Sequence, residues 1–175
     1  ETHSILQRMR ELAVQSATDT NTEVDRGEIQ KEIDQLAAEI TRIADTTEFN
    51  TQNLLGGEFE ATFHIGANEG QNITLKIEAM DAESLGVGEG EVGEVEGLNV
   101  STQEAADEAI TIINDAIETV SAERSKLGAM QNRLEHTIAN LGTSAENLQA
   151  AESRIRDLDM AQEIMEFTKS NILNQ

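Results

Sequence analysis

The chain has 175 residues, with 12 Lys and Arg against 34 Asp and Glu, and therefore a formal charge of −22. This charge argues against nucleic acid and anionic membrane surfaces as partners, because both are bound through Lys and Arg that neutralise phosphates. The absence of cysteine excludes disulfides and thiolate chemistry. Aromatic residues make up only 2% of the chain, so aliphatic side chains must build the core.

Residues 1–46 carry two apolar stripes with helical spacing. The first consists of Ile5, Met9, Leu12, Ala13 and Ser16, and the second of Ile29, Ile33, Leu36, Ile40 and Ile43. Residues 18–22 between them are Thr, Asp and Asn, whose side chains compete for backbone hydrogen bonds and interrupt helices. The pattern predicts two antiparallel helices joined by a tight turn, with Asn21 or Thr22 capping the second.

The section 47–100 has a different pattern. Apolar and polar residues alternate over 59–65 and again over 73–77, with a connector at 66–72 that is rich in Gly and Asn. This pattern predicts a β-hairpin. Residues 86–97 are mostly Gly, Glu and Val, which favours a mobile acidic loop. We interpret this loop as a solvated linker; a weak cation site is the alternative, without the spacing of a calcium loop.

From Thr102 to the end the pattern is helical throughout. A 3,4 repeat from Ile110 to Asp159 has apolar residues at eleven of fifteen positions, which predicts a seam like that of a coiled coil. The principal members of this helix-packing seam are Ile110, Ile113, Ile117, Val120, Leu127, Leu134, Ile138, Leu141, Leu148 and Ile155. Gly128 and Gly142 would each cost about 1 kcal/mol inside a helix. We therefore expect a neighbour to pack closely against them.

The three predicted helices differ greatly in length. At ~1.5 Å per residue they would extend to roughly 25, 37 and 100 Å in chain order. The two short helices cannot cover the third, so residues beyond about 134 should expose an apolar seam in an isolated copy. The predicted fold class is mainly α with a small β-hairpin region, arranged as an elongated, rod-like antiparallel helical bundle.

The sequence shows no constellation that supports catalysis, a cofactor or a metal. His3, His64 and His136 have no ligand spacing between any two of them, and we predict that the protein is not an enzyme. The sequence gives better support to a surface that binds other proteins than to a catalytic site. On a helical wheel Arg8, Glu11, Leu12 and Gln15 flank the first apolar stripe, while Glu28, Glu32 and Glu39 flank the second. From the residues alone, Arg8 and Glu32 are solvated flank charges or a weak ion pair.

Six stretches together resemble bacterial flagellin of the Bacillus type. They are residues 6–16 (Leu-Gln-Arg-Met-Arg-Glu-Leu-Ala-Val-Gln-Ser), 47–50 (Thr-Glu-Phe-Asn), 65–70 (Ile-Gly-Ala-Asn-Glu-Gly), 126–134 (Lys-Leu-Gly-Ala-Met-Gln-Asn-Arg-Leu), 153–159 (Ser-Arg-Ile-Arg-Asp-Leu-Asp) and 171–175 (Asn-Ile-Leu-Asn-Gln).

The resemblance implies a division of the chain along the flagellin plan. Residues 1–46 would be the N-terminal helix pair of the rod-shaped D1 domain, 47–85 its β-hairpin region and 101–155 its long C-terminal helix. Residues 86–100 would be an acidic loop in place of outer domains. Residues 156–175 would begin the C-terminal D0 segment, one of two terminal segments that build the inner tube of the filament.

The resemblance also implies a function. Flagellins are structural subunits of the extracellular flagellar filament, exported unfolded without a cleaved signal, and they bind other flagellin subunits and export chaperones or assembly factors. Vertebrate Toll-like receptor 5 recognises flagellin through the first two D1 helices. By motif, Arg8, Leu12 and Glu32 match that hot spot, flanked by Gln7, Glu11 and Gln15. The alternative is a coiled-coil hook-associated or secretion-system interaction protein.

Overall fold

A computed structural model describes residues 1–90 and 95–174, with the side chains of 157–159 and 161 left undescribed. Its helices are α1 (Thr2–Ser16), α2 (Glu23–Thr46) and α3 (Gln103–Leu173). The strands are β1 (Glu48–Phe49), β2 (Gln52–Asn53), β3 (Glu60–His64), β4 (Asn72–Lys76), β5 (Gly88–Glu89) and β6 (Glu96–Gly97). Among these residues the strands form separate antiparallel pairs, β1–β2, β3–β4 and β5–β6.

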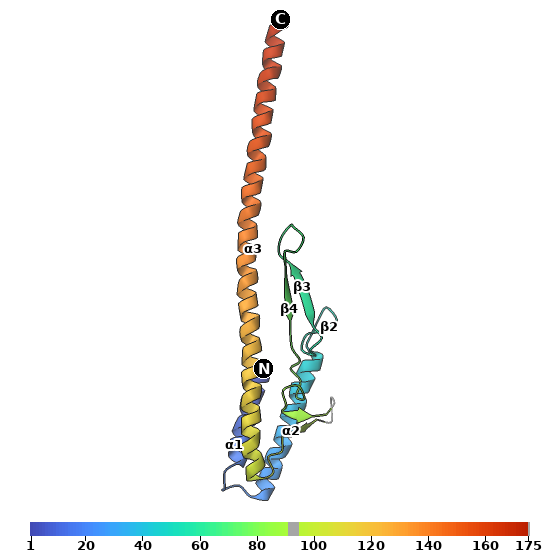
Figure 1. Ribbon diagram of the computed structural model, residues 1–175, viewed down its shortest axis with the longest axis vertical. Helices are drawn as coiled ribbons and strands as arrows, with labels where there is room; N and C mark the ends of the chain where they lie inside the picture. The colour runs from blue at the N-terminus through green and yellow to red at the C-terminus, as the bar shows by residue number, and fades with distance from the viewer. Residues whose placement is uncertain (91–94, 175) are drawn as a thin grey trace.

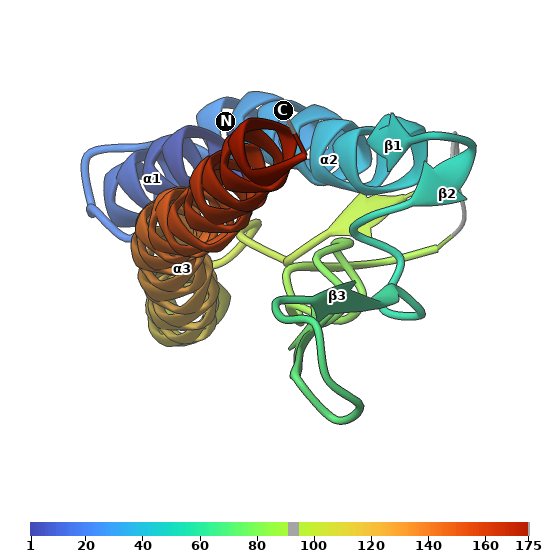
Figure 2. The ribbon, with the colours of Figure 1, turned by 90° about the horizontal axis from the view of Figure 1, so that it is seen from above.

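The molecule is a rod. Helix α3 runs its whole length, and α1 and α2 pack together at one end, with the N-terminus part of the way up α3 and the C-terminus at the far tip (Figure 1). Seen along the rod, the strand pairs lie on one side of the helices (Figure 2). The predicted fold class is confirmed. No helix in the described part of the chain has an apolar stretch able to span a membrane.

The turn between α1 and α2 is built by side chains, as predicted. Thr22 is the N-cap of α2: its hydroxyl accepts from Asp25 N–H, while the Asp25 carboxylate accepts from Thr22 N–H at 3.0 Å. This reciprocal arrangement is a capping box. On the other side of the turn, the Arg26 guanidinium donates to the carbonyls of Ser16 and Thr18 at 2.9 and 3.3 Å, so unpaired carbonyls at the end of α1 are satisfied.

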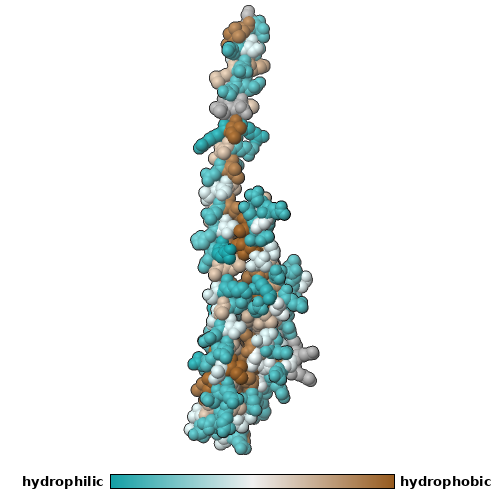
Figure 3. Space-filling model, viewed as in Figure 1, coloured by the Kyte–Doolittle hydropathy of each residue, from teal (hydrophilic) through white to brown (hydrophobic). Residues whose placement is uncertain are grey.

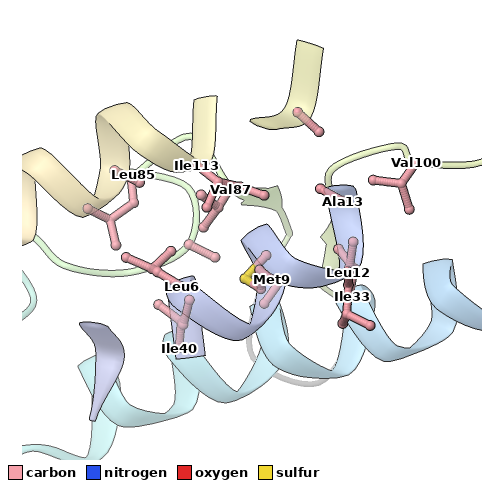
Figure 4. Close-up of a cluster of buried hydrophobic side chains, with 14 of the residues drawn as sticks. Leu6, Met9, Leu12, Ala13, Ile33, Ile40, Leu85, Val87, Val100 and Ile113 are labelled. Carbon is pink, nitrogen blue, oxygen red and sulfur yellow. The ribbon is translucent and has the colours of Figure 1, made fainter. Parts of the chain in front are cut away.

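The core lies where all three helices meet (Figure 4). Its fully buried members include Leu6, Met9 and Leu12 from α1, Ile33 and Ile40 from α2, Ile113 from α3, and Val87 and Val100 from the segment between. The Ser16 hydroxyl donates to the carbonyl of Val100 at 2.6 Å inside this core. The end of α1 is therefore tied directly to the segment that leads into α3.

The first part of the predicted α3 seam packs into the bundle. Ile113 and Val120 are buried, and Ile110 and Ile117 are partly buried and packed against the core. The positions that share the buried face are Ala106, Ala109 and Ala116. The sequence-based seam included only one alanine, because it was chosen for large apolar side chains. The short side chain of Ala buries well because it lets α1 approach the backbone of α3 closely. Large residues one position later then flank the contact.

The predicted hairpin is confirmed as β3–β4, paired from Glu60 with Lys76 to His64 with Asn72. Ile73 and Ile77 are buried, whereas Phe63 is 39% exposed. Lys126 of α3 fixes the base of the hairpin: its ammonium donates to the carbonyl of Lys76 at 2.6 Å and pairs with Glu123 at 3.0 Å.

The expectation of a mobile loop over 86–97 is wrong for its described residues; residues 91–94 lie outside them. Val87, Val95 and Val100 are buried. Two side chains of α2 clamp the returning segment: Gln30 accepts from Val100 N–H at 2.7 Å and donates to Leu98 O at 3.0 Å, while Asp34 accepts from Gly97 N–H at 3.0 Å. The glycines permit the fit, because a Cβ on Gly97 would lie 2.7 Å from Ile33 Cγ2.

Beyond the bundle α3 stands alone. Leu127 and Leu134 are half-buried, and Ile138, Leu141, Leu148 and Ile155 are 45–72% exposed. Brown apolar residues follow the rod above its broad base in Figure 3. The prediction of an uncovered seam is confirmed for this single copy. The neighbour expected at Gly128 and Gly142 is not found, since a Cβ at either position would meet nothing within 4 Å.

Gly97→Ala should lower the free energy of unfolding by about 1–3 kcal/mol, because the added methyl group overpacks the contact between β6 and α2. Thermal denaturation followed by circular dichroism measures the loss. Gly128→Ala is the matched control: its Cβ has open space, and replacing Gly in a helix is favourable by up to about 1 kcal/mol. Equal melting temperatures for Gly97→Ala and wild type would contradict the packing of β6.

The capping box should make stability depend on acid. The pKa of Asp25 is lowered, first by the backbone N–H of Thr22 and then by its hydroxyl. A carboxylate with a lowered folded pKa stabilises the fold above its unfolded pKa of about 4, and the contribution is lost as pH falls through the folded value. Melting temperatures of wild type and Asp25→Asn should differ at pH 7 and converge near pH 2. A difference that persists at pH 2 would contradict this account.

Candidate partner-binding surfaces

The first candidate surface centres on Arg8, which joins α1 to α2. Its Nε and Nη2 donate to the same oxygen, Oε1 of Glu32, at 3.0 and 2.8 Å, and its Nη1 donates to Oε2 of Glu11 at 3.2 Å. The pair that the sequence suggested is therefore formed. Two residues 24 positions apart meet across the helix pair because their helices run antiparallel and both lie beside the apolar stripe.

The electrostatics of this cluster are those of a surface site. The pKa of Arg8 is raised, mainly by its hydrogen bond to Glu32 and next by that to Glu11. The side chains of Arg8 and Glu32 are 50% and 46% exposed, so solvent screens their attraction. The cluster therefore orients its charged groups without contributing greatly to stability, and it leaves half of each side chain free for a partner.

Leu12 does not lie on this surface. The sequence placed it both in the apolar stripe and, by the wheel, on the flank of that stripe; the structure buries it to 2% exposure in the core of the helix bundle, which confirms the first assignment. The reason is that α1 is covered on two sides, by α2 and by α3, so its buried face is wider than a single stripe. Leu12, one turn after Arg8, therefore anchors the helix that presents Arg8.

The outer face of α1 carries the flanking residues. Gln7, Glu11 and Gln15 are exposed as expected, and the Gln7 amide lies 3.1 Å from His3 Nε2. A shallow hollow on this face is lined by Gln7, Arg10, Glu11 and Val14. Arg10 and Val14 were not predicted. Val14 could have been found in the sequence, because it is an apolar residue that lies outside the apolar stripe. Its side chain is 49% exposed.

The second candidate surface is the exposed part of the α3 seam. It starts at Leu134 and continues through Ile138, Leu141, Leu148 and Ile155 along one side of the helix. Leu158, three residues beyond Ile155 and so in the same helical spacing, lies outside the described side chains. Exposed apolar residues that repeat along a helix are typical of a face that another helix covers.

The described residues give little support to metal binding or to catalysis by histidine. They contain no group of three or more His, Asp or Glu able to hold a metal ion. His64 and His136 are exposed, whereas His3 is half-buried rather than solvated, with its Nδ1 buried and without a hydrogen-bond partner. The fold and these surfaces define an elongated helical protein that offers surface to partners.

Comparison with known families and proteins identifies the group. The family model described as the bacterial flagellin N-terminal helical region matches residues 1–60, and that of the C-terminal helical region matches residues 110–175. The flagellin of Clostridium tyrobutyricum is 36% identical over the whole chain, which covers 75% of that protein. The chain belongs to the bacterial flagellin family, whose members are structural proteins and not enzymes.

Two further relatives are also flagellins. The flagellin of Halalkalibacterium halodurans is 51% identical over all of this chain and 62% of its own length, and that of Bacillus subtilis is 47% identical over 66% of its length. The chain thus spans less than two thirds of these relatives.

Solved structures match as well. The crystal structure of Bacillus cereus flagellin is 32% identical, with a TM-score of 0.67 over 79% of this chain and 77% of that one. FliC from Burkholderia pseudomallei, at 19% identity and a TM-score of 0.65 over 75% and 94%, shows the same fold.

Proposed function

We propose that this chain is the rod section of a structural subunit of the extracellular bacterial flagellar filament, and that its main partners are other flagellin subunits. The observation that carries the proposal is the apolar seam of α3 that remains uncovered in a single copy. A relative that is 47% identical over this chain is named a flagellar filament 33 kDa core protein, from Treponema phagedenis.

The energetics support assembly. Each large aliphatic side chain left in water forgoes roughly 1.5–3 kcal/mol of stabilisation, and the seam has several such side chains beyond Leu134. Export chaperones or assembly factors would cover the same seam before assembly. The division into D1 helix pair (1–46), hairpin region (47–85), long helix (101–155) and start of D0 (156–175) follows from the same proposal.

The alternative of a hook-associated or secretion-system protein is less well supported, because the matching family models and relatives are those of flagellins and filament proteins.

The full-length protein that contains this chain should restore filaments to a bacterium whose own flagellin gene is deleted. Electron microscopy and swimming in soft agar give the readouts. The double variant Ile138→Asp with Leu148→Asp should abolish filaments, because both changes place charge on the seam. The control Glu135→Asp with Glu146→Asp keeps charge and leaves the seam intact, so filaments should persist. Filaments formed by the seam variant would contradict the proposed role of this face.

We further propose that the Arg8 surface is recognised by vertebrate Toll-like receptor 5. Arg8 and Glu32 would be the main contacts, with Gln7, Glu11 and Gln15 at the edge and Leu12 as the buried support. What favours this is a forked guanidinium held in place by Glu32 and Glu11 yet half-exposed. Arg residues ordered in this way are frequent anchors of protein interfaces.

Arg8→Ala should reduce the response of reporter cells that carry the receptor by about tenfold or more, as expected for an interface anchor. Helical content should be unchanged, because the side chain lies outside the core. The control is Arg42→Ala, since Arg42 makes a similar two-nitrogen contact with Glu39 on α2 at 2.8 and 2.6 Å. A response to Arg8→Ala equal to that of wild type would leave Arg8 as a flank charge only.

A further inference from the structure

The turn between β1 and β2 presents an exposed aromatic ring. Phe49 is 72% exposed, in a chain that contains only four Phe and no Trp or Tyr. It stands opposite Gln52 in the strand pair, at the edge of a two-residue turn. A ring of this size gains much from burial, and its exposure in a single copy calls for an explanation.

Asn53 holds this turn rigidly to the end of α2. Its side-chain amide donates to the carbonyls of Ala44 and Asp45, both at 2.9 Å, and its side-chain oxygen accepts from the N–H groups of Leu55 and Gly56 at 2.8 and 2.6 Å. One residue thus satisfies the last turn of α2 and the chain that follows. Phe49 is consequently presented on a fixed support.

The turn itself is strained. Asn50 and Thr51 have φ angles of 51° and 65°, so both central residues are in the left-handed region, as in a type I′ turn. Asn tolerates this conformation, but a β-branched Thr does so rarely. Such strain persists where surrounding structure enforces it, and it is more frequent at functional sites than elsewhere.

The local charge favours contact with another copy. Copies with a net charge of −22 repel one another, so subunits meet at least cost where the surface is uncharged. Residues 49–57 form a run of nine without a charged side chain. The exposed ring therefore lies at one end of an uncharged stretch on a molecule of high net negative charge.

We propose that the β1–β2 turn, with Phe49 at its edge, is a contact between subunits and that its occupant is a second copy of this protein. The inference rests on the proposed filament function and adds to it a specific site, separate from the α3 seam. A contact that repeats through an open assembly is heterologous, so the surface of the neighbour that receives the ring would differ from the turn itself.

These 175 residues contain no cysteine, so none of them competes with an introduced thiol. Phe49→Cys and, as control, Val24→Cys are introduced singly into the full-length protein; Val24 is 74% exposed at the start of α2, away from the turn. A maleimide reagent is applied to monomers and to assembled filaments. In filaments, labelling at position 49 should slow at least about tenfold relative to monomers, as for a site reached only by local opening. Labelling at position 24 reports any general slowing by assembly.

A second variant covers the case in which the Cys substitution alters assembly. Phe49→Ala should leave the melting temperature of the monomer unchanged and lower the temperature at which filaments depolymerise. Filaments that label equally fast as monomers at position 49, or that depolymerise at the wild-type temperature with Phe49→Ala, would overturn the subunit contact while the filament function stands. Failure of the wild-type protein to form filaments would instead overturn the proposed function and this inference with it.

Discussion

The structure depends on a mismatch of length: a helix of 71 residues shares one core with helices of 15 and 24, and of these two it packs mainly against the shorter, α1. A helix gains most of its stability from packing of its apolar face and not from propensity, so only the first part of α3 is stabilised within the copy. Val120 is the last buried residue of α3 among those described, and burial is only partial at Leu127 and Leu134. The same helix is therefore a core element at one end and a surface for other chains at the other.

The bundle end is held by polar contacts as much as by apolar ones. Gln30 and Asp34 on α2 replace a neighbouring strand, since they supply hydrogen-bond partners to the backbone of 97–100. This arrangement lets a segment too rich in Gly and Glu to pack by itself lie against a helix. It also positions Val100, and so the start of α3, beside Ser16. The geometry of the long helix is thus set by a few side chains of a short one.

Periodicity predicted the hairpin and the three helices of the described residues, and residue type placed the cap of α2 at Asn21 or Thr22, because these features depend on neighbours in sequence. It misjudged features that depend on distant partners. It identified Ile110 and Ile117, which pack against the edge of the core, but missed Ala109 and Ala116, whose short side chains are buried more deeply. Leu12 was assigned both to the apolar stripe and to its flank, and the second assignment fails because a wheel shows one helix and not the two that cover it. The segment 86–97 was expected to be mobile because its composition does not reveal that Gln30 and Asp34 will hold it. The sequence offered the Arg8–Glu32 ion pair as one of two possibilities. Only the antiparallel packing of α1 and α2 shows that the two side chains meet.

The hydrogen bond between Ser16 and Val100 joins residues 84 positions apart, and this has a consequence for folding order. The α1–α2 hairpin closes a short loop and forms early, because local contacts are the fastest to form. The apolar face of this helix pair is fully buried only after a loop of more than eighty residues has closed. The conformational entropy of that closure is lost before the contacts of Ile113 and Val120 can compensate for it. A chain that leaves the ribosome or an export channel with its N-terminus first therefore has no complete core until residues near 120 have also come out. Late acquisition of the core keeps such a chain extended for most of its emergence.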